Sequence, residues 1–92
     1  MAQPVRDNKG RVVGRTFTLA DAHGFREAAA ASDRVAALAL ARGDEKSAVR
    51  WRADANRQRR HARTVVAAVL DGDGRCLTLP DGRFVALAEA TP

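Results

Sequence analysis

The chain is poor in cysteine, aromatic residues and long apolar runs. Its 92 residues include one cysteine, one tryptophan, three phenylalanines and no tyrosine. A single cysteine cannot form an internal disulfide, and the first thirty residues lack the continuous apolar stretch of a signal peptide. No apolar run approaches the roughly twenty residues that are needed to cross a bilayer. These absences predict a cytoplasmic protein with no membrane partner.

Patterns for catalysis, metal binding or cofactor binding are missing as well. His23 and His61 fall in separate segments, and neither has a cysteine or carboxylate at ligand spacing. The segment from Asp71 begins like an EF-hand loop, but Gly82 stands at the twelfth position, where a carboxylate is required. The glycines do not form a phosphate-binding loop followed by a helix. We therefore expect no metal, no cofactor and no enzymatic activity.

Alanine, in contrast, makes up twenty of the 92 residues and recurs at seven-residue spacing in two segments. Small side chains at successive heptad positions allow two helix backbones to approach closely. The turn at residues 42–44 separates the segments, so the pattern predicts two tightly packed antiparallel helices. The repeated positions are Ala22, Ala29 and Ala36, then Ala48, Ala55 and Ala62, with Val69 at the next step.

Local signals place the ends of these helices. Thr18 and Asp21 form a capping-box pattern, which predicts that the first helix starts near Leu19. Gly43 ends that helix, and Asp44 is a favourable N-cap for a second helix that continues to about Leu70.

The remaining segments are typical of strands. Valine, threonine and phenylalanine favour an extended conformation over 11–18, and the turn at Pro80-Asp81-Gly82 predicts a hairpin of 76–79 with 83–87. The expected fold class is α+β, an antiparallel two-helix hairpin with a small antiparallel sheet in the order β-α-α-β-β. We expect a basic N-terminal arm over 1–10, a single domain over 11–89 and a frayed C-terminus over 90–92.

Two larger side chains interrupt the alanine pattern of the second helix. Trp51 falls on the predicted inner stripe, which favours an anchor of the core or of a dimer interface over a base-stacking residue. Gln58 also falls on the stripe, where a polar side chain either fixes helix pairing or is simply solvated. Because each alanine buries little apolar area at roughly 25 cal/mol per Å², we expect a weak monomer core and a homodimer.

Charge is unevenly distributed along the chain. The net charge of +5 combines +3 over residues 1–18, +4 over 44–70 and −2 from residue 71 onward. Fourteen arginines against two lysines, with no isoleucine or tyrosine, are also typical of the codon usage of a GC-rich genome. The number of arginines therefore carries less information than their clustering.

The second helix is the predicted nucleic-acid-binding element. Helical periodicity distributes its arginines over both flanks and the outer side, where guanidinium groups can bond phosphates or guanine edges. The scarcity of aromatic residues argues against single-strand binding. The candidate residues are Arg50, Arg52, Arg57, Arg59, Arg60 and Arg63, together with Arg11 and Arg15 near the N-terminus.

Three hypotheses for the role of this charge remain open. The first is a small non-enzymatic nucleic-acid-binding module, with DNA favoured over RNA. The second is an acidic protein partner, or an adaptor or assembly component of a bacterial or phage complex that acts through the helical hairpin. The third is a merely solvated helix whose arginine stems cover apolar neighbours. An exposed apolar patch over Phe84, Val85 and Leu87 would favour the adaptor, whereas a continuous positive face would favour nucleic acid.

A winged helix-turn-helix domain shares the order of elements, with residues 46–63 as recognition helix and 80–83 as wing tip. That hypothesis requires a break in the first helix at Ser32-Asp33 and helices much shorter than the alanine pattern predicts.

Overall fold

The computed structural model describes residues 3–6 and 12–87, and contains two long helices and a four-stranded sheet. The expected α+β class and the order β-α-α-β-β are confirmed, with one additional strand at the N-terminus. The elements are β1 (Gln3–Arg6), β2 (Val12–Thr16), α1 (Leu19–Ala41), α2 (Glu45–Asp71), β3 (Arg75–Thr78) and β4 (Phe84–Ala86).

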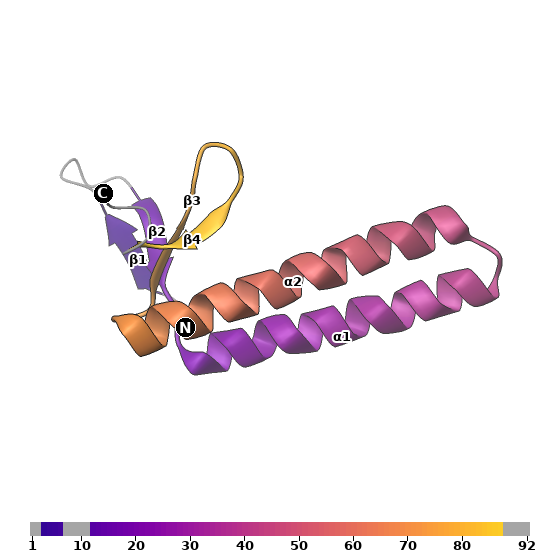
Figure 1. Cartoon of the computed structure of the whole chain (residues 1–92), viewed down its shortest axis with the longest axis horizontal. Coiled ribbons are helices and arrows are strands. Elements are labelled where there is room, and N and C mark those ends of the chain that lie inside the picture. The colour runs from indigo at the N-terminus through magenta and orange to yellow at the C-terminus, as the bar shows by residue number, and fades with distance from the viewer. Residues whose placement is uncertain (1–2, 7–11, 88–92) are drawn as a thin grey trace.

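The helices form a hairpin that projects from the sheet (Figure 1). The sheet lies at the end of the hairpin where α1 begins and α2 ends, and the molecule measures 51 × 25 × 22 Å. α1 is one continuous helix of 23 residues that includes Ser32 and Asp33. The winged helix-turn-helix hypothesis is therefore wrong, because it requires a break at this position.

All neighbouring strands pair antiparallel in the order β1-β2-β3-β4. β1 lies inside the segment predicted as a basic arm, and it pairs with β2 from Gln3 opposite Thr16 to Arg6 opposite Val12. The reason is that β2 presents unpaired backbone groups along its outer edge, which a neighbouring extended segment can satisfy. Residues 7–11 of the predicted arm and domain, and the predicted frayed end at 90–92, lie outside the described residues.

The predicted helix caps are present. Thr18 N–H donates to Asp21 Oδ2 at 2.8 Å while the Thr18 hydroxyl accepts from Asp21 N–H, which completes the capping box. Gly43 takes a φ of 79° at the end of α1, a conformation that glycine adopts at little cost. Asp44 Oδ1 accepts from Ser47 N–H at 3.1 Å, and hydrogen bonding by Ser47 lowers the pKa of Asp44.

The seam between α1 and α2 is made almost entirely of alanine, as predicted. The one polar member is Ser32, whose hydroxyl donates to Asp54 Oδ2 at 2.6 Å. The seam residues are Ala22, Ala29, Ser32, Ala36 and Ala39 on α1, with Ala48, Ala55, Ala62, Val65 and Ala68 buried on α2.

Trp51 is 42% exposed, so the prediction of a core anchor is wrong, while the alternative of a dimer-interface anchor stays a prediction. Alanine contacts bring the two backbones too close for an indole to lie between them, so the ring is displaced to the side of the hairpin. Gln58 and Val69 are only half-buried, and Val69 packs against the edge of the core. Val65 and Ala68 are the fully packed residues at this end of α2.

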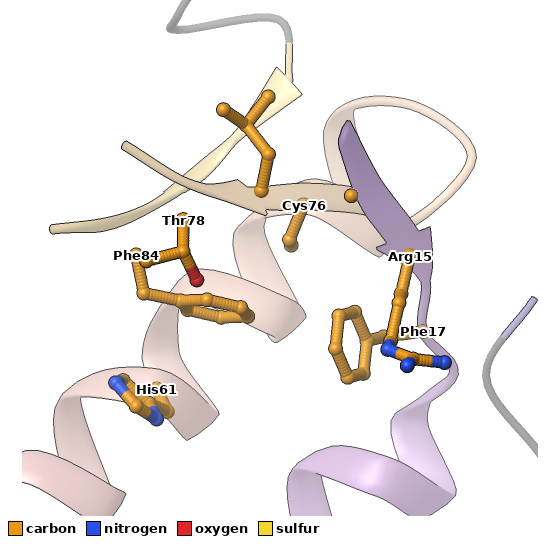
Figure 2. Close-up of a pocket in the computed structure, with 8 residues that line it drawn as sticks. Arg15, Phe17, His61, Cys76, Thr78 and Phe84 are labelled. Carbon is orange, nitrogen blue, oxygen red and sulfur yellow. The ribbon is translucent and has the colours of Figure 1, made fainter. Parts of the chain in front are cut away.

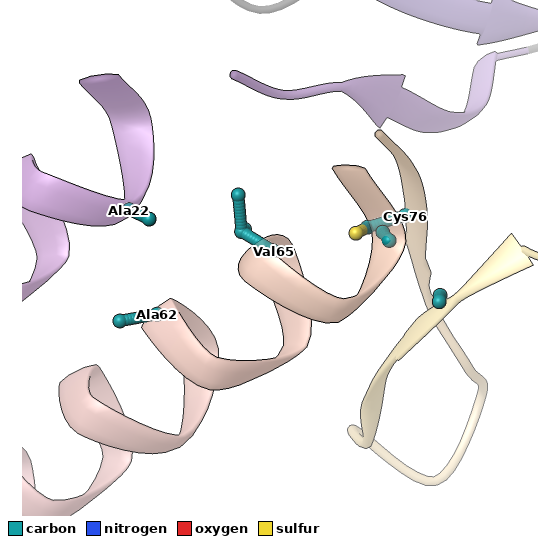
Figure 3. Close-up of a cluster of buried hydrophobic side chains, with 6 residues drawn as sticks. Ala22, Ala62, Val65 and Cys76 are labelled. Carbon is teal, nitrogen blue, oxygen red and sulfur yellow. The ribbon is translucent and has the colours of Figure 1, made fainter. Parts of the chain in front are cut away.

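The widest part of the core lies where the hairpin meets the sheet. Ala22, Ala62, Val65 and Cys76 converge there (Figure 3). Phenylalanine rings from three elements pack around this cluster, with centroids of Phe17 and Phe84 5.5 Å apart and those of Phe17 and Phe25 6.1 Å apart. Aromatic rings therefore supply the apolar area that the alanine seam lacks.

Replacing Ala55 by leucine tests the closeness of the seam. Ala55 is fully buried, and a leucine there overpacks the interface, so we expect a loss of about 1–3 kcal/mol in the free energy of unfolding. Ala53 is exposed on the same helix, and Ala53→Leu is the matched control with little expected effect. Urea denaturation followed by circular dichroism measures both variants. Equal stability of the two would contradict the tight seam.

Candidate nucleic-acid interface

The predicted arginines of α2 extend over about 20 Å of helix at 1.5 Å per residue. Five of their six side chains are exposed and one is half-buried. Arg50, Arg52, Arg57, Arg60 and Arg63 are exposed, and Arg59 is half-buried. The helix therefore presents positive charge over most of its length.

Two of these arginines are engaged within the hairpin. Arg59 Nη1 donates to Asp33 Oδ2 of α1 at 2.7 Å, and Arg59 Nη2 donates to Asn56 Oδ1 at 2.6 Å. Arg57 pairs with Asp54, which also accepts the hydrogen bond from Ser32. The Arg59–Asp33 and Ser32–Asp54 bonds join α1 to α2, whereas the Arg57–Asp54 pair lies within α2. Part of the arginine cluster therefore has a structural role.

The other four arginines of α2 are free to meet an external anion. Within the described part of the chain they form no ion pair and no side-chain hydrogen bond. They are Arg50, Arg52, Arg60 and Arg63.

The sheet encloses a first hollow beside α2. Arg15 and Phe17, from β2 and the residue after it, lie opposite His61 of α2 and Phe84 of β4 (Figure 2). The hollow has a volume of about 410 Å³, and Thr78 adds a hydroxyl to its wall.

Two further hollows continue along α2 away from the sheet. The second, of about 430 Å³, shares His61 and Phe84 with the first and adds Arg57, Arg60 and the β3–β4 turn. The third, of about 600 Å³, shares Arg57 and Arg60 with the second. We call these three hollows, which share lining residues, the α2 groove. The third hollow is lined by Ser47, Arg50, Trp51, Ala53, Asp54, Arg57 and Arg60.

The α2 groove gathers only part of the predicted site. Arg15, Arg50, Arg57 and Arg60 line it, whereas Arg52, Arg59 and Arg63 line none of its three hollows. Arg11 lies outside the described residues.

Trp51, Arg83 and Phe84 are among the lining residues that the predicted site did not include. Trp51 is next to Arg50 in the sequence, which was a local signal for an aromatic residue beside a cation. Nothing local places Arg83 beside α2, because the two meet only through the packing of the β3–β4 hairpin against the helix.

The groove is positively charged. Its five arginines are accompanied by two aspartates, both of which are hydrogen-bonded. Asp81 accepts from the Arg83 backbone N–H at 3.0 Å and from Arg83 Nε at 2.7 Å, and these bonds lower the pKa of Asp81.

His61 packs against two aromatic rings at the edge of the groove. Its ring centroid lies 4.6 Å from that of Phe84 and 5.4 Å from that of Phe25. Burial lowers the pKa of His61, and the charges of Arg57 and Arg60 lower it further. Since the ordinary pKa is already 6.5, His61 is neutral at pH 7.

The comparisons with known proteins add no family to this description. No family model matches the chain, and neither the curated proteins nor the solved structures include a match. Across residues 3–6 and 12–87, no three His, Cys, Asp or Glu side chains are grouped so that they could hold a metal ion. No helix in the same residues is both long and apolar enough to cross a membrane.

The lowered pKa of His61 predicts a pH-dependent stability. Below pH 6.5 the unfolded chain takes up a proton more readily than the folded one, so stability falls as the pH drops through 6.5. We expect His61→Gln to reduce this fall in stability. The urea midpoint measured between about pH 7.5 and 5.5 tests this, because the ordinary pKa values of carboxylates lie below that window.

The control variant is His23→Gln, since His23 is exposed and pairs with Glu27 on the surface of α1. This variant retains His61 and should show the pH dependence of the unmodified chain. An undiminished fall in His61→Gln would contradict the assignment to His61.

Proposed function

We propose that the chain is a small non-enzymatic nucleic-acid-binding module that binds its ligand along the α2 groove. The observation that carries this proposal is the arrangement of Arg50, Arg57, Arg60 and Arg15 along three adjoining hollows. Guanidinium groups spaced along one groove suit a phosphate backbone, because each can form charge-assisted bonds to successive phosphates. Arg52 and Arg63 contribute further positive charge from the other flank of α2.

The codon usage of a GC-rich genome accounts for the number of arginines, but not for which of them have a carboxylate partner. Aspartates neutralise arginines at several places, as in the Arg75–Asp73 and Arg83–Asp81 pairs. Along the outer side of α2, however, Arg50 and Arg60 have no such partner among the described residues. A surface that has uncompensated charge at this density favours a polyanionic ligand over simple solvation.

The second candidate is a protein partner, either an adaptor function or a second copy of the chain. It is favoured by Leu38, Leu40 and Val49, large apolar side chains that are exposed near the far end of the hairpin. Against it, Phe84, Val85 and Leu87 are all half-buried, so the apolar patch that would favour an adaptor is not exposed at the sheet. The expected homodimer stays a prediction.

Salt dependence tests the nucleic-acid proposal. We expect binding to random-sequence DNA, offered as duplex and as single strand, and to a matched RNA. The affinity should decrease steeply with salt because counterions are released from the phosphates. The double variant Arg50→Ala with Arg60→Ala should weaken binding and lower the slope of log K against log salt by about 1–2.

The matched control is Arg34→Ala with Arg42→Ala, which removes the same charge from α1 and the turn after it. Both arginines are exposed and line none of the hollows of the α2 groove. Equal losses in the two double variants would indicate an effect of net charge rather than of the groove. No binding to any of the nucleic acids at low salt would overturn the proposal.

A further inference from the structure

The third hollow of the α2 groove combines an exposed aromatic ring with cations. Trp51 is 42% exposed although it is the largest apolar side chain in the protein. Arg50, Arg57 and Arg60 line the same hollow, and its single carboxylate, Asp54, is held by Ser32 and Arg57. The ring therefore lies among positive charges that have few internal partners.

We propose that Trp51 stacks on an unpaired base, so that the α2 groove takes single-stranded nucleic acid in preference to duplex, contrary to the expectation from the scarcity of aromatic residues. This inference rests on the proposed function and names the form of the ligand. Stacking on an aromatic side chain beside a basic groove is how proteins hold single strands without reading their sequence. The hollow has a volume of about 600 Å³, is open to solvent and is lined by side chains of α2 alone, so a flat base can reach the indole from outside.

The surroundings of α2 disfavour a duplex. The major groove of B-DNA is about 12 Å wide, and a helix with its side chains is already about 10–12 Å across. α1 covers one side of α2 along the hairpin, and the β3–β4 hairpin stands beside α2 near the sheet (Figure 1). Asp81, Gly82 and Arg83 of its turn line one hollow with Arg57, Arg60 and His61. These neighbours leave less room beside α2 for a rigid duplex than for a single strand.

The same charges disfavour a second copy of the chain at this position. A two-fold interface centred on Trp51 would bring the basic patch of Arg50, Arg57 and Arg60 together with a second copy of the same patch. Like charges that face each other across an interface oppose association. An anionic ligand with a flat ring is therefore the occupant that the hollow fits.

The fluorescence of Trp51 reports this site directly, because the chain contains one tryptophan and no tyrosine. We expect an oligothymidine of about 15 nucleotides to quench the emission as it binds, a length within the known site sizes of about 4–16 nucleotides. An abasic oligonucleotide of the same length has the same phosphates and no bases, so it should bind more weakly and leave the emission nearly unchanged. A duplex of the same length should also bind more weakly than the single strand.

Two variants separate stacking from charge. Trp51→Ala should weaken binding to oligothymidine by about tenfold, with no change in its salt dependence and little change for the abasic strand. Val49→Ala is the matched control, since Val49 is exposed on the same helix and does not line the hollow. Circular dichroism of all variants checks that α2 remains folded.

The possible contrary results distinguish a failure of stacking from a failure of nucleic-acid binding. Equal affinity for oligothymidine, abasic strand and duplex, with unchanged emission, would overturn the stacking proposal while the nucleic-acid proposal stands. No binding to any of them would overturn both. Emission that shifts with protein concentration alone would identify a second copy at Trp51 and overturn the proposal.

Discussion

The close approach of α1 and α2 is the constraint on which the rest of the structure depends. Alanines at seven-residue spacing leave so little room between the backbones that no large side chain fits there. Large apolar residues of the hairpin must then lie elsewhere. Phe25 packs at the base against the sheet, whereas Trp51 and Val49 lie on the surface of the far half. The same feature that holds the helices together thus places an aromatic ring in contact with solvent.

Alanine contacts bury little area, so the hairpin depends on its base for much of its apolar stabilisation. There the rings of Phe17, Phe25 and Phe84 surround Val65 and connect both helices to the sheet. This connection also sets the position of the β3–β4 turn, in which Leu79 N–H donates to Arg83 O and Gly82 N–H donates to Leu79 O. The hollow that the turn shares with α2 therefore depends on the core packing that holds β4 beside the helix.

The arginines of α2 divide between structure and surface. Arg59 joins the helices through Asp33 on one side of the seam, and Asp54 joins them through Ser32 on the other. Such pairs at partly exposed positions contribute modestly to stability, on the order of 1 kcal/mol or less, but they define how the helices face each other. The arginines left over, notably Arg50 and Arg60, give the groove its charge. The exposed Trp51 ring beside Arg50 and Arg60 is what links the two proposals for this protein.

Local chemistry was sufficient to predict most of the fold. The capping box at Thr18, the glycine at 43, the alanine spacing and the turn after Pro80 each act over a few residues, so the sequence by itself determined the elements and their order. It did not determine the partners of those elements. β1 exists because β2 has an open edge, and Trp51 is exposed because the opposite helix lies too close. Arg15 and Arg83, far apart in the chain, reach one groove only through the sheet. Tertiary structure alone decided these features, since each depends on distances between segments that local propensities do not specify.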